Sequence, residues 1–269
     1  MSVQTLYTAA TGMEALQTKL DVVANNLANV NTTAFKRGHA NFEDLFYRHH
    51  AFPGALDAQN TPTATGTSIG LGSRVSSVQT DFTQGAFRQT NDPLNILIEG
   101  KGFLQVLDPS TNQTLYTRAG NLSVNANGQL VVGSASTGRM IQPPVTIAGT
   151  DITNISINDS GQVLVKQVGQ PQPQQVGQLQ LALFVNPEGL LKLGENLYST
   201  TTASGDAQFA NPGLNGAGSI RSGMLEASNV EPVQELIDLI TTQRSFELNS
   251  QAIKAGDEIL QLISNLRRG

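Results

Sequence analysis

The chain has three histidines, His39, His49 and His50, and they are its only side chains that could act as a base or a metal ligand through an imidazole. The nearby carboxylates Glu43 and Asp44 complete a set that a metal ion could use. However, His49 and His50 are adjacent and cannot both point to one side of a regular element, and the spacing differs from a helical His-Glu-x-x-His motif. We therefore expect solvated loop histidines and no metal site.

Nucleophilic and phosphate-transfer chemistry also lack a motif. A Ser-His-Asp triad would have to use one of the same histidines, and no Gly-x-Ser-x-Gly elbow is present. The absence of cysteine excludes thiol catalysis, disulfides and cysteine-based zinc sites. Glycine-rich stretches at 69–72, 99–103 and 215–218 complete neither a dinucleotide fingerprint nor a P-loop, and each is more typical of a turn or bulge.

Carboxylates are scattered over the middle of the chain, and no spacing among them selects a catalytic pair. A glycosidase-like pair of acids would support the hypothesis of a secreted enzyme that acts on the cell wall. We predict instead that the protein is not an enzyme, with no catalytic residue, no cofactor, and no cofactor-binding or metal-binding residue. The carboxylates concerned are Asp57, Asp81, Asp92, Glu99, Asp108, Asp151, Asp159, Glu188, Glu195 and Asp206.

The composition is polar but weakly charged. Charged residues make up 14% and hydrophobic residues 39%, and 16 basic against 21 acidic residues leave a formal net charge of −5. Because there is no basic block, we expect no nucleic-acid partner. No apolar run approaches the roughly 18 residues that span a bilayer, and residues 1–20 lack the pattern of a cleaved signal peptide. We therefore expect no membrane span and no cleaved signal.

A long helix is predicted near the N-terminus. Apolar residues recur there at alternating separations of three and four, which is the heptad spacing of a helix with one apolar seam. A helix of about 28 residues would be roughly 42 Å long. Gly12 inside it costs about 1 kcal/mol relative to alanine, so the helix is expected to depend on packing partners. The seam residues, predicted to form an assembly interface, are Leu6, Ala9, Met13, Leu16, Leu20, Val23, Leu27 and Val30.

A second, longer helix is predicted at the C-terminal end. Its start carries two signals a few residues apart, a Ser228-x-x-Glu231 capping-box pattern and Pro232, and the sequence does not choose between them. A flanking stripe at intervals of seven comprises Leu239, Phe246, Ile253 and Leu260. The main stripe, predicted to be the other half of the assembly interface, comprises Ile237, Ile240, Leu248, Ala252, Ala255, Ile259, Leu262 and Leu266.

Between the helices the pattern changes to short strands and turns. The stretches "LSVNANGQLVV" at 122–132 and "ISINDSGQVLV" at 155–165 match position by position as strand, Asn-x-x-Gly turn and strand, and "LFVNPEGLLKL" at 183–193 is a fainter copy. Each predicts a β-hairpin. Further strands are predicted at 94–98, 103–106, 115–118 and 176–185, and connections at 48–72 and 200–218.

These elements predict an α+β fold with long N- and C-terminal helices and a central antiparallel all-β domain. Neither helix has an obvious third helical partner within the chain, so their exposed faces would need other copies of the protein. Assembly is therefore the functional hypothesis, and an ordinary two-helix stalk is the alternative.

The sequences at both ends of the chain resemble those of flagellar rod and hook proteins. "ANNLANVNTTAFKR" at 24–37 is similar to the N-terminal signature of that family, and "EASNVEPVQELIDLITTQRSFELNSQAI" at 226–253 is similar to its C-terminal signature. The blocks at 97–106 and 116–131 resemble the family's shared β-domain. The signature positions singled out are Asn25, Asn26, Leu27, Ala28, Asn29, Phe35, Lys36, Ser228, Asn229, Val230, Gln243 and Arg244.

Within that family, the whole length of the chain and the blocks at 194–205 and 211–230 resemble the subunits of the distal rod. Departures are small: Glu99 stands where Asp is common, Leu104 stands where an aromatic residue is common, and 46–72 aligns only loosely. Other axial relatives, of the proximal rod or hook type, are the nearest alternative.

The resemblance implies a division into an N-terminal helix at 1–39, an extended linking segment at 40–75, a central β-domain at 76–227 and a C-terminal helix at 228–269. It also implies that the two helices form a coiled-coil tube with the β-domain outside it. The implied function is a rigid, hollow helical shaft in the periplasm that transmits motor torque to the hook. The implied partners are other copies of the chain, proximal rod proteins, the hook protein, the surrounding P- and L-ring proteins, the rod cap and the type III export apparatus.

Overall fold

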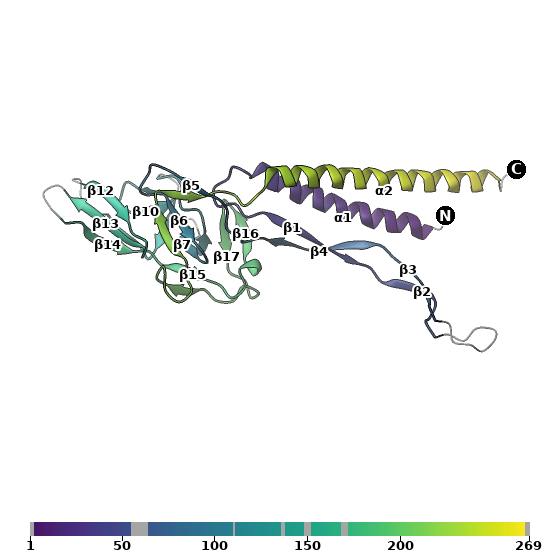
Figure 1. The fold of residues 1–269 in the computed structure, drawn as a ribbon, viewed down its shortest axis with the longest axis horizontal. Helices are drawn as coiled ribbons and strands as arrows, with labels where there is room; N and C mark the ends of the chain where they lie inside the picture. The colour runs from purple at the N-terminus through teal and green to yellow at the C-terminus, as the bar shows by residue number, and fades with distance from the viewer. Residues whose placement is uncertain are drawn as a thin grey trace. The chain divides into compact units, whose positions relative to one another are not determined.

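The computed structural model describes residues 3–54, 64–109, 111–135, 138–147, 152–167 and 172–266. The fold is α+β, with helix α1 (Val3–Ala28), helix α2 (Pro232–Leu266) and a β-rich region between them (Figure 1). The chain forms two compact units. The helical unit comprises Met1–Ala28, Gly38–Thr80 and Glu231–Gly269, and the β-rich unit comprises Asn29–Arg37 and Asp81–Val230.

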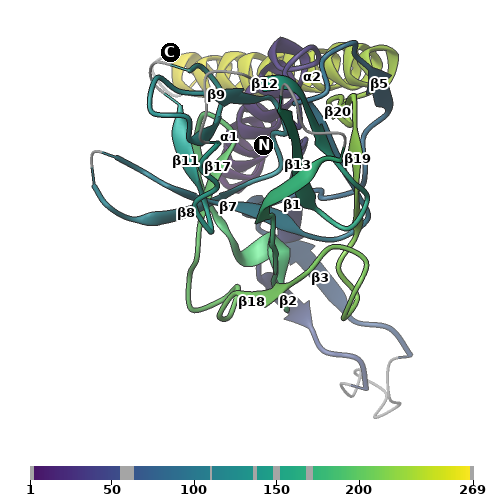
Figure 2. The same cartoon turned by 90° about the vertical axis from the view of Figure 1, so that its left-hand side faces the viewer.

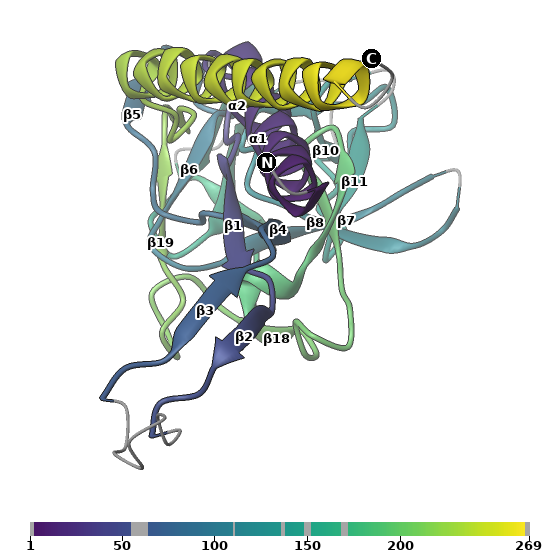
Figure 3. The same cartoon turned by 90° about the vertical axis from the view of Figure 1, so that its right-hand side faces the viewer.

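In the helical unit, α1 lies between α2 and a two-stranded β-ribbon (Figures 1 and 3). The two helices run antiparallel. The ribbon begins with β1 (Gly38–Asp44) paired to β4 (Ser73–Thr80), with a bulge between Asn41 and Phe42. It continues as β2 (Tyr47–Ala51) paired to β3 (Thr67–Gly70). The prediction of a plain connection over 48–72 is therefore wrong at its described ends, because these residues pair with each other as strands.

The start of α2 settles which of its two signals operates. The helix begins at Pro232, and the amide of Glu235 donates to the carbonyl of Glu231 at 3.0 Å. The hydroxyl of Ser228 instead accepts from the amide of Val230 at 3.3 Å, before the helix. Proline at the first helical position, where the missing N–H is not needed, is therefore the operative signal.

The largest sheet in the described part of the β-rich unit has nine strands, with β16-β17-β8-β7-β11-β10-β9 as its main path and β15 and β18 joined through β7. Of these strands, β17, β8, β7, β11, β9 and β18 are labelled in Figure 2. The strand pairs of this sheet are antiparallel. The bounds are β7 (Phe103–Leu107), β8 (Thr114–Thr117), β9 (Leu122–Val124), β10 (Leu130–Val132), β11 (Arg139–Gln142), β15 (Leu181–Leu183), β16 (Leu191–Gly194), β17 (Leu197–Ser199) and β18 (Gln208–Ala210).

Smaller sheets complete this unit. A three-stranded sheet joins β12 (Ile152–Ile157), β13 (Gln162–Gln167) and β14 (Gln174–Gln178), and two-stranded ladders join β6 to β19 and β5 to β20. The ladder strands are β5 (Phe87–Gln89), β6 (Ile96–Glu99), β19 (Ser219–Ser222) and β20 (Met224–Glu226). The strand predicted at 176–185 is thus two strands, β14 and β15, in different sheets.

Two of the three sequence echoes are hairpins with the same turn chemistry. The side-chain oxygen of Asn125 accepts from the amide of Gln129 at 2.8 Å, and that of Asn158 accepts from the amide of Gln162 at 2.8 Å. In both turns the glycine amide, of Gly128 or Gly161, donates to the carbonyl of the same asparagine at 2.9 Å. The prediction of these two hairpins is confirmed.

The third echo is not a hairpin. Its turn is a short 3-10 helix at Pro187–Gly189, and the flanking strands pair elsewhere, β15 with β18 and β7, and β16 with β17. The side chain of Asn186 does not close a local turn in the manner of Asn125, because it donates to the carbonyl of Ala203 at 3.2 Å. The predicted hairpin at 183–193 is therefore wrong.

The hydrophobic core of the β-rich unit lies between its sheets. Side chains that are almost fully buried include Ile96, Leu104, Leu130, Val163 and Ile220, which come from five different strands. A separate aromatic cluster contains ring pairs that are edge to face, except for one tilted pair, with ring centroids 4.9–5.7 Å apart; its members are Phe82, Phe103, Tyr116, Phe184 and Tyr198. Of the buried ions described below, Glu226 lies on β20 and Arg118 directly follows β8.

Candidate assembly surface and buried ion cluster

Helix α2 exposes an apolar stripe on the face turned away from α1. Ile240 is 54%, Leu248 65% and Leu262 62% exposed, although each is a large hydrophobic side chain. Of the predicted α2 stripe, Ile237, Ala252 and Ala255 are also exposed, Ile259 is half-buried, and the side chain of Leu266 lies outside the described residues. We name this surface the α2 stripe and add the exposed Val233 and Leu236 to it.

The opposite face of α2 packs on α1. Its buried residues are Glu235, Thr242 and Gly256, and the flanking stripe of Leu239, Phe246, Ile253 and Leu260 is half-buried between them. These positions follow one another at separations of four, three, four, three, four, three and again four when Asn249 is included, as a heptad seam requires. The side chain of Asn249 lies 3.4 Å from the position that a Cβ on Gly12 would take.

The predicted seam of α1 is covered within the chain. Val23 is buried, and the other predicted seam residues are half-buried, because α1 contacts α2 on one side and the β1–β4 ribbon on the other. Val30 follows the helix and belongs to the β-rich unit, where it is half-buried. The α1 half of the predicted assembly interface therefore already has partners inside the chain.

Asn26, one of the signature residues, fastens the helical unit internally. Its side chain is buried, accepts from the amide of Gly38 at 2.8 Å and donates to the carbonyl of Gly38 at 2.9 Å. It also donates to a carboxylate oxygen of Glu235 at 3.2 Å. The side-chain amide of Asn26 thus connects α1 both to the ribbon and to α2. It uses its donor and its acceptor group to do so.

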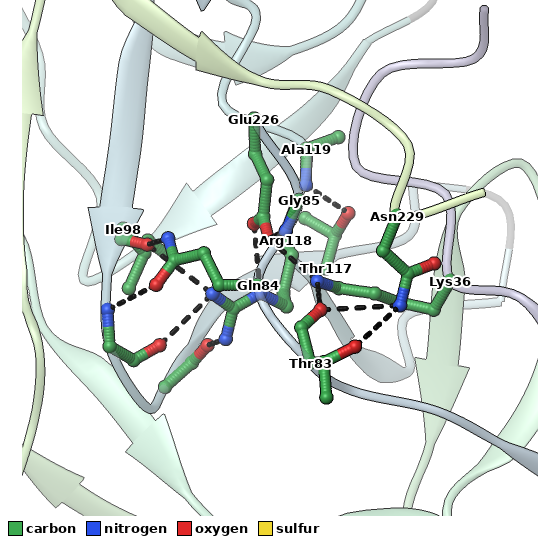
Figure 4. Close-up of polar contacts among 12 residues, drawn as sticks. Lys36, Thr83, Gln84, Gly85, Ile98, Thr117, Arg118, Ala119, Glu226 and Asn229 are labelled. Carbon is green, nitrogen blue, oxygen red and sulfur yellow. Dashed lines mark hydrogen bonds and ion pairs between the residues drawn. The ribbon is translucent and has the colours of Figure 1, made fainter. Parts of the chain in front are cut away.

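The β-rich unit contains three buried ions in direct contact (Figure 4). Lys36, Glu226 and Arg118 have side chains that are 0%, 1% and 4% exposed. The lysine ammonium lies 2.6 Å from Oε1 of Glu226, and Nε of Arg118 lies 3.0 Å from Oε2. The amide of Gly85 also donates to Oε1 at 3.1 Å. Glu226 therefore accepts three hydrogen bonds, two of them from cations.

Both cations also donate to backbone carbonyls. Lys36 donates to the carbonyl of Thr83 at 2.6 Å, and Arg118 donates to those of Gly102, Gly100 and Ile98 at 3.0, 3.0 and 3.3 Å. A buried ion cluster is tolerated only when its donors and acceptors are satisfied in this way. Gly85 has no room for a side chain, since a Cβ there would collide with the carbonyl oxygen of Ala227.

The cluster holds two cations against one anion. Burial lowers the pKa of Lys36, and the nearby Arg118 acts in the same direction, while the carboxylate of Glu226 opposes the shift. Burial also favours the neutral form of the Tyr198 hydroxyl, and it therefore raises the pKa of Tyr198 far above its ordinary range. Because a charged group is costly to bury without a counter-ion, Glu226 is the group on which both cations depend.

The segment after α1 and the segment before α2 are joined to each other in the β-rich unit. Asn229 accepts from the amide of Arg37 at 2.8 Å and donates to the carbonyl of Asp81 at 2.9 Å. Lys192 donates to the carbonyl of Lys36 at 2.9 Å, and its ammonium lies 5.4 Å from the centre of the Phe35 ring. The signature segments thus meet side by side, although they are far apart in sequence.

The other signature residues have different surroundings. Ser228 and Val230 are buried beside Asn229, Leu27 and Asn29 are half-buried, and Asn25, Ala28, Gln243 and Arg244 are exposed. Sequence reasoning singled out Lys36 but missed Arg118 and Glu226 as its partners. The available signal was the rarity of charged residues, because a charged residue in or next to a strand of a weakly charged β-domain needs a partner when it is buried.

The histidines do not form a site. His39 lies on β1 and His49 and His50 on β2; all three are exposed, and the ring of His49 stacks on Phe52 with centroids 5.1 Å apart. Among the described residues, no group of three or more His, Asp or Glu is placed to hold a metal ion. No helix in the described part of the chain is long and apolar enough to cross a membrane.

Three protein-family models match the chain, and together they define its class. Residues 6–36 match the model of flagella basal body rod proteins. Residues 97–165 match the D1 domain of flagellar hook proteins FlgE/F/G, and residues 221–266 match the C-terminal region of the flagellar basal body rod FlgEFG proteins. The first match contains Lys36, the middle match contains Arg118 and the last match contains Glu226. The fold and these matches are those of an axial subunit of the flagellum.

Full-length relatives narrow the class. The flagellar basal-body rod protein FlgG of Caulobacter vibrioides is 45% identical over 265 residues, which are 98% of this chain and 99% of the relative. FlgG of Bacillus subtilis is 38% identical over 98% of this chain and 99% of its own, whereas the hook-basal body complex protein FlhP of the same species is 32% identical over the same shares. The chain belongs to the FlgG family of flagellar basal-body rod proteins, of the distal-rod type, and is a structural subunit of that rod.

Proposed function

We propose that the chain polymerises into a rigid, hollow helical shaft that transmits motor torque to the hook. In this proposal the two terminal helices form a coiled-coil tube, and the central antiparallel β-domain lies outside it. The observation that carries the proposal is the α2 stripe. It is a row of large apolar side chains that α1 leaves uncovered.

Burial of the α2 stripe against another copy supplies the driving force for assembly. Full burial of a large aliphatic side chain stabilises by about 1.5–3 kcal/mol, and Ile240, Leu248 and Leu262 are each more than half exposed in the single chain. Contiguous exposed apolar surface is typical of protein interaction sites. A head-to-tail contact between identical subunits that does not close into a ring produces an open helix, as a shaft requires.

The tip of the β-ribbon is a second contact in the proposed shaft. Phe46, Tyr47 and Phe52, in or beside β2, are exposed aromatic residues at the described end of the ribbon. Aromatic residues are frequent anchors in protein interfaces. We therefore include a contact of this tip with a neighbouring subunit, which would stiffen the lattice.

The partners in this proposal are other copies of the chain, the proximal rod proteins, the hook protein, the P- and L-ring proteins and the rod cap. The proposed route to the periplasm is export in an unfolded state through the type III apparatus. Membership of the FlgG family supports these partners over those of a proximal rod or hook subunit. The secreted-enzyme alternative has no support among the relatives, which are named as rod or hook-basal body proteins.

The substitution Ile240→Glu tests the proposal because it places a charge in the middle of the α2 stripe without touching the α1 seam. We expect a folded monomer that no longer polymerises and cells that are not motile. The matched control is Thr241→Glu, which adds the same charge at an exposed position one residue further round the helix. Sedimentation measures polymer and circular dichroism measures folding. Polymerisation of Ile240→Glu at the normal concentration, or equal loss in the control, would contradict the role of the stripe.

A further inference from the structure

The chain contains two Asn-Gly pairs, Asn127–Gly128 and Asn215–Gly216, and they are built into different turns. In such a pair the glycine nitrogen can attack the asparagine side-chain carbon. A C–N bond forms, the proton of the glycine amide leaves with the amide nitrogen as ammonia, and a succinimide ring results. Water then opens the ring at one of its two carbonyls, which leaves aspartate or isoaspartate. The reaction needs a free glycine N–H and a backbone that can rotate.

In the first pair, the glycine amide already donates a hydrogen bond. The amide of Gly128 donates to the carbonyl of Asn125 at 2.9 Å, and the amide of Asn127 donates to the side chain of Asn125 at 3.0 Å. The carbonyl of Gly128 accepts from the amide of Ile147 at 2.7 Å. Attack by Gly128 would first have to break the hydrogen bond that closes the turn.

The second pair occupies the two central positions of a different turn, in which both residues have positive φ angles. The hydrogen bond that closes it runs from the amide of Ala217 to the carbonyl of Leu214 at 2.9 Å, so it bypasses Gly216. Asn215 and Gly216 have φ angles of 53° and 80°, as a type I′ turn requires. Both residues are exposed, and a Cβ built on Gly216 would meet no described atom within 4 Å beyond those of its chain neighbours. No acceptor in the described residues binds the Gly216 amide.

We propose that Asn215 is a site of spontaneous deamidation and that the fold protects Asn127. Each event replaces a neutral amide with a carboxylate, so a chain of formal charge −5 gains one further negative charge. Where isoaspartate forms, the turn also gains a methylene group in its backbone. The fraction of chains deamidated at Asn215 therefore rises with the time since the chain folded. The fold determines that Asn215, and not Asn127, is the residue modified.

The test is an incubation of the folded full-length chain at body temperature in mildly alkaline buffer. Peptide mass mapping follows conversion at both asparagines, and isoelectric focusing follows the new acidic species. We expect Asn215 to convert at least about fivefold faster than Asn127, as expected when one hydrogen bond must break before reaction. The variant Asn215→Gln should remove the acidic species, because glutamine forms the larger ring slowly.

The same chain unfolded in urea is the matched control. Without turns, the two Asn-Gly pairs should convert at similar rates, which isolates the fold as the cause of the difference. Equal rates in the folded chain, or faster conversion of Asn127 there, would overturn the proposal. A folded chain in which Asn215 stays intact while the urea sample converts would overturn it as well.

Discussion

Glu226 is the single anion of the buried ion cluster in the β-rich unit. One carboxylate accepts from Lys36, from Arg118 and from the amide of Gly85, and its side chain is 1% exposed. The two cations come from segments 190 and 108 residues away in sequence. The cluster therefore joins the segment after α1 and strand β20 to Arg118, the residue that directly follows β8 of the main sheet.

The substitution Glu226→Gln should destabilise the β-rich unit by about 3–5 kcal/mol, because it leaves two buried cations without their counter-ion. Chemical denaturation of the full chain, followed by the fluorescence of the buried tyrosines, measures the loss. The matched control is Glu99→Gln, which makes the same change in a half-exposed ion pair with Arg221 at 2.8 Å. A surface pair contributes little, so the control should hardly change stability. Equal effects of the two substitutions would contradict the role assigned to the buried cluster.

At the scale of elements, α2 has two faces with different tasks. Its half-buried flank packs on α1, and its exposed stripe is available to another copy. Sequence periodicity identified both stripes, since residues three and four apart share one face of a helix. It could not say which stripe stays inside the chain, because both are apolar, and only the position of α1 decides that.

A substitution at Val23 tests whether the α1 seam packs within the chain or against another copy. Val23 was predicted to lie in the assembly interface, but it is 5% exposed within the helical unit. The substitution Val23→Asp buries an unpaired carboxylate, so we expect the helical unit to lose about 3 kcal/mol of stability while the β-rich unit stays folded. Hydrogen exchange of the amides of α1 and α2 measures this loss.

The control for Val23→Asp is Ala24→Asp, which places the same carboxylate on the next, exposed residue of α1. Here the only expected cost is the lower helix propensity of aspartate, about 0.7 kcal/mol. If Val23→Asp left α1 and α2 as protected as the control does, and only polymerisation suffered, Val23 would belong to the contact between copies.

At the scale of the whole molecule, the weak charge of the chain has a consequence for assembly. Only 14% of residues are charged, and the α2 stripe is dominated by aliphatic side chains. Apolar contacts are not screened by salt, unlike contacts between exposed ions. We therefore expect the concentration at which polymer first forms to change less than about threefold between about 0.05 and 0.5 M salt. Sedimentation at several salt concentrations measures it, and a steep loss of polymer at high salt would indicate that ion pairs drive assembly.

The sequence by itself determined the two terminal helices, the two Asn-x-x-Gly hairpins and the resemblance to rod and hook proteins. These features are encoded locally, by apolar spacing, turn residues and contiguous signature blocks, so neighbours in sequence suffice to predict them. For the start of α2 the sequence contains two local signals, and the structure shows that the helix begins at one of them, Pro232.

Only the tertiary structure decided which face of α2 meets α1, why the third echo at 183–193 is not a hairpin, and which residues surround Lys36. In each case the deciding partner is distant in sequence: α1 for α2, Ala203 for Asn186, and Glu226 with Arg118 for Lys36. A local pattern predicts that a segment is a helix, strand or turn, but the burial of a charge or of an apolar face depends on what the rest of the chain packs against it.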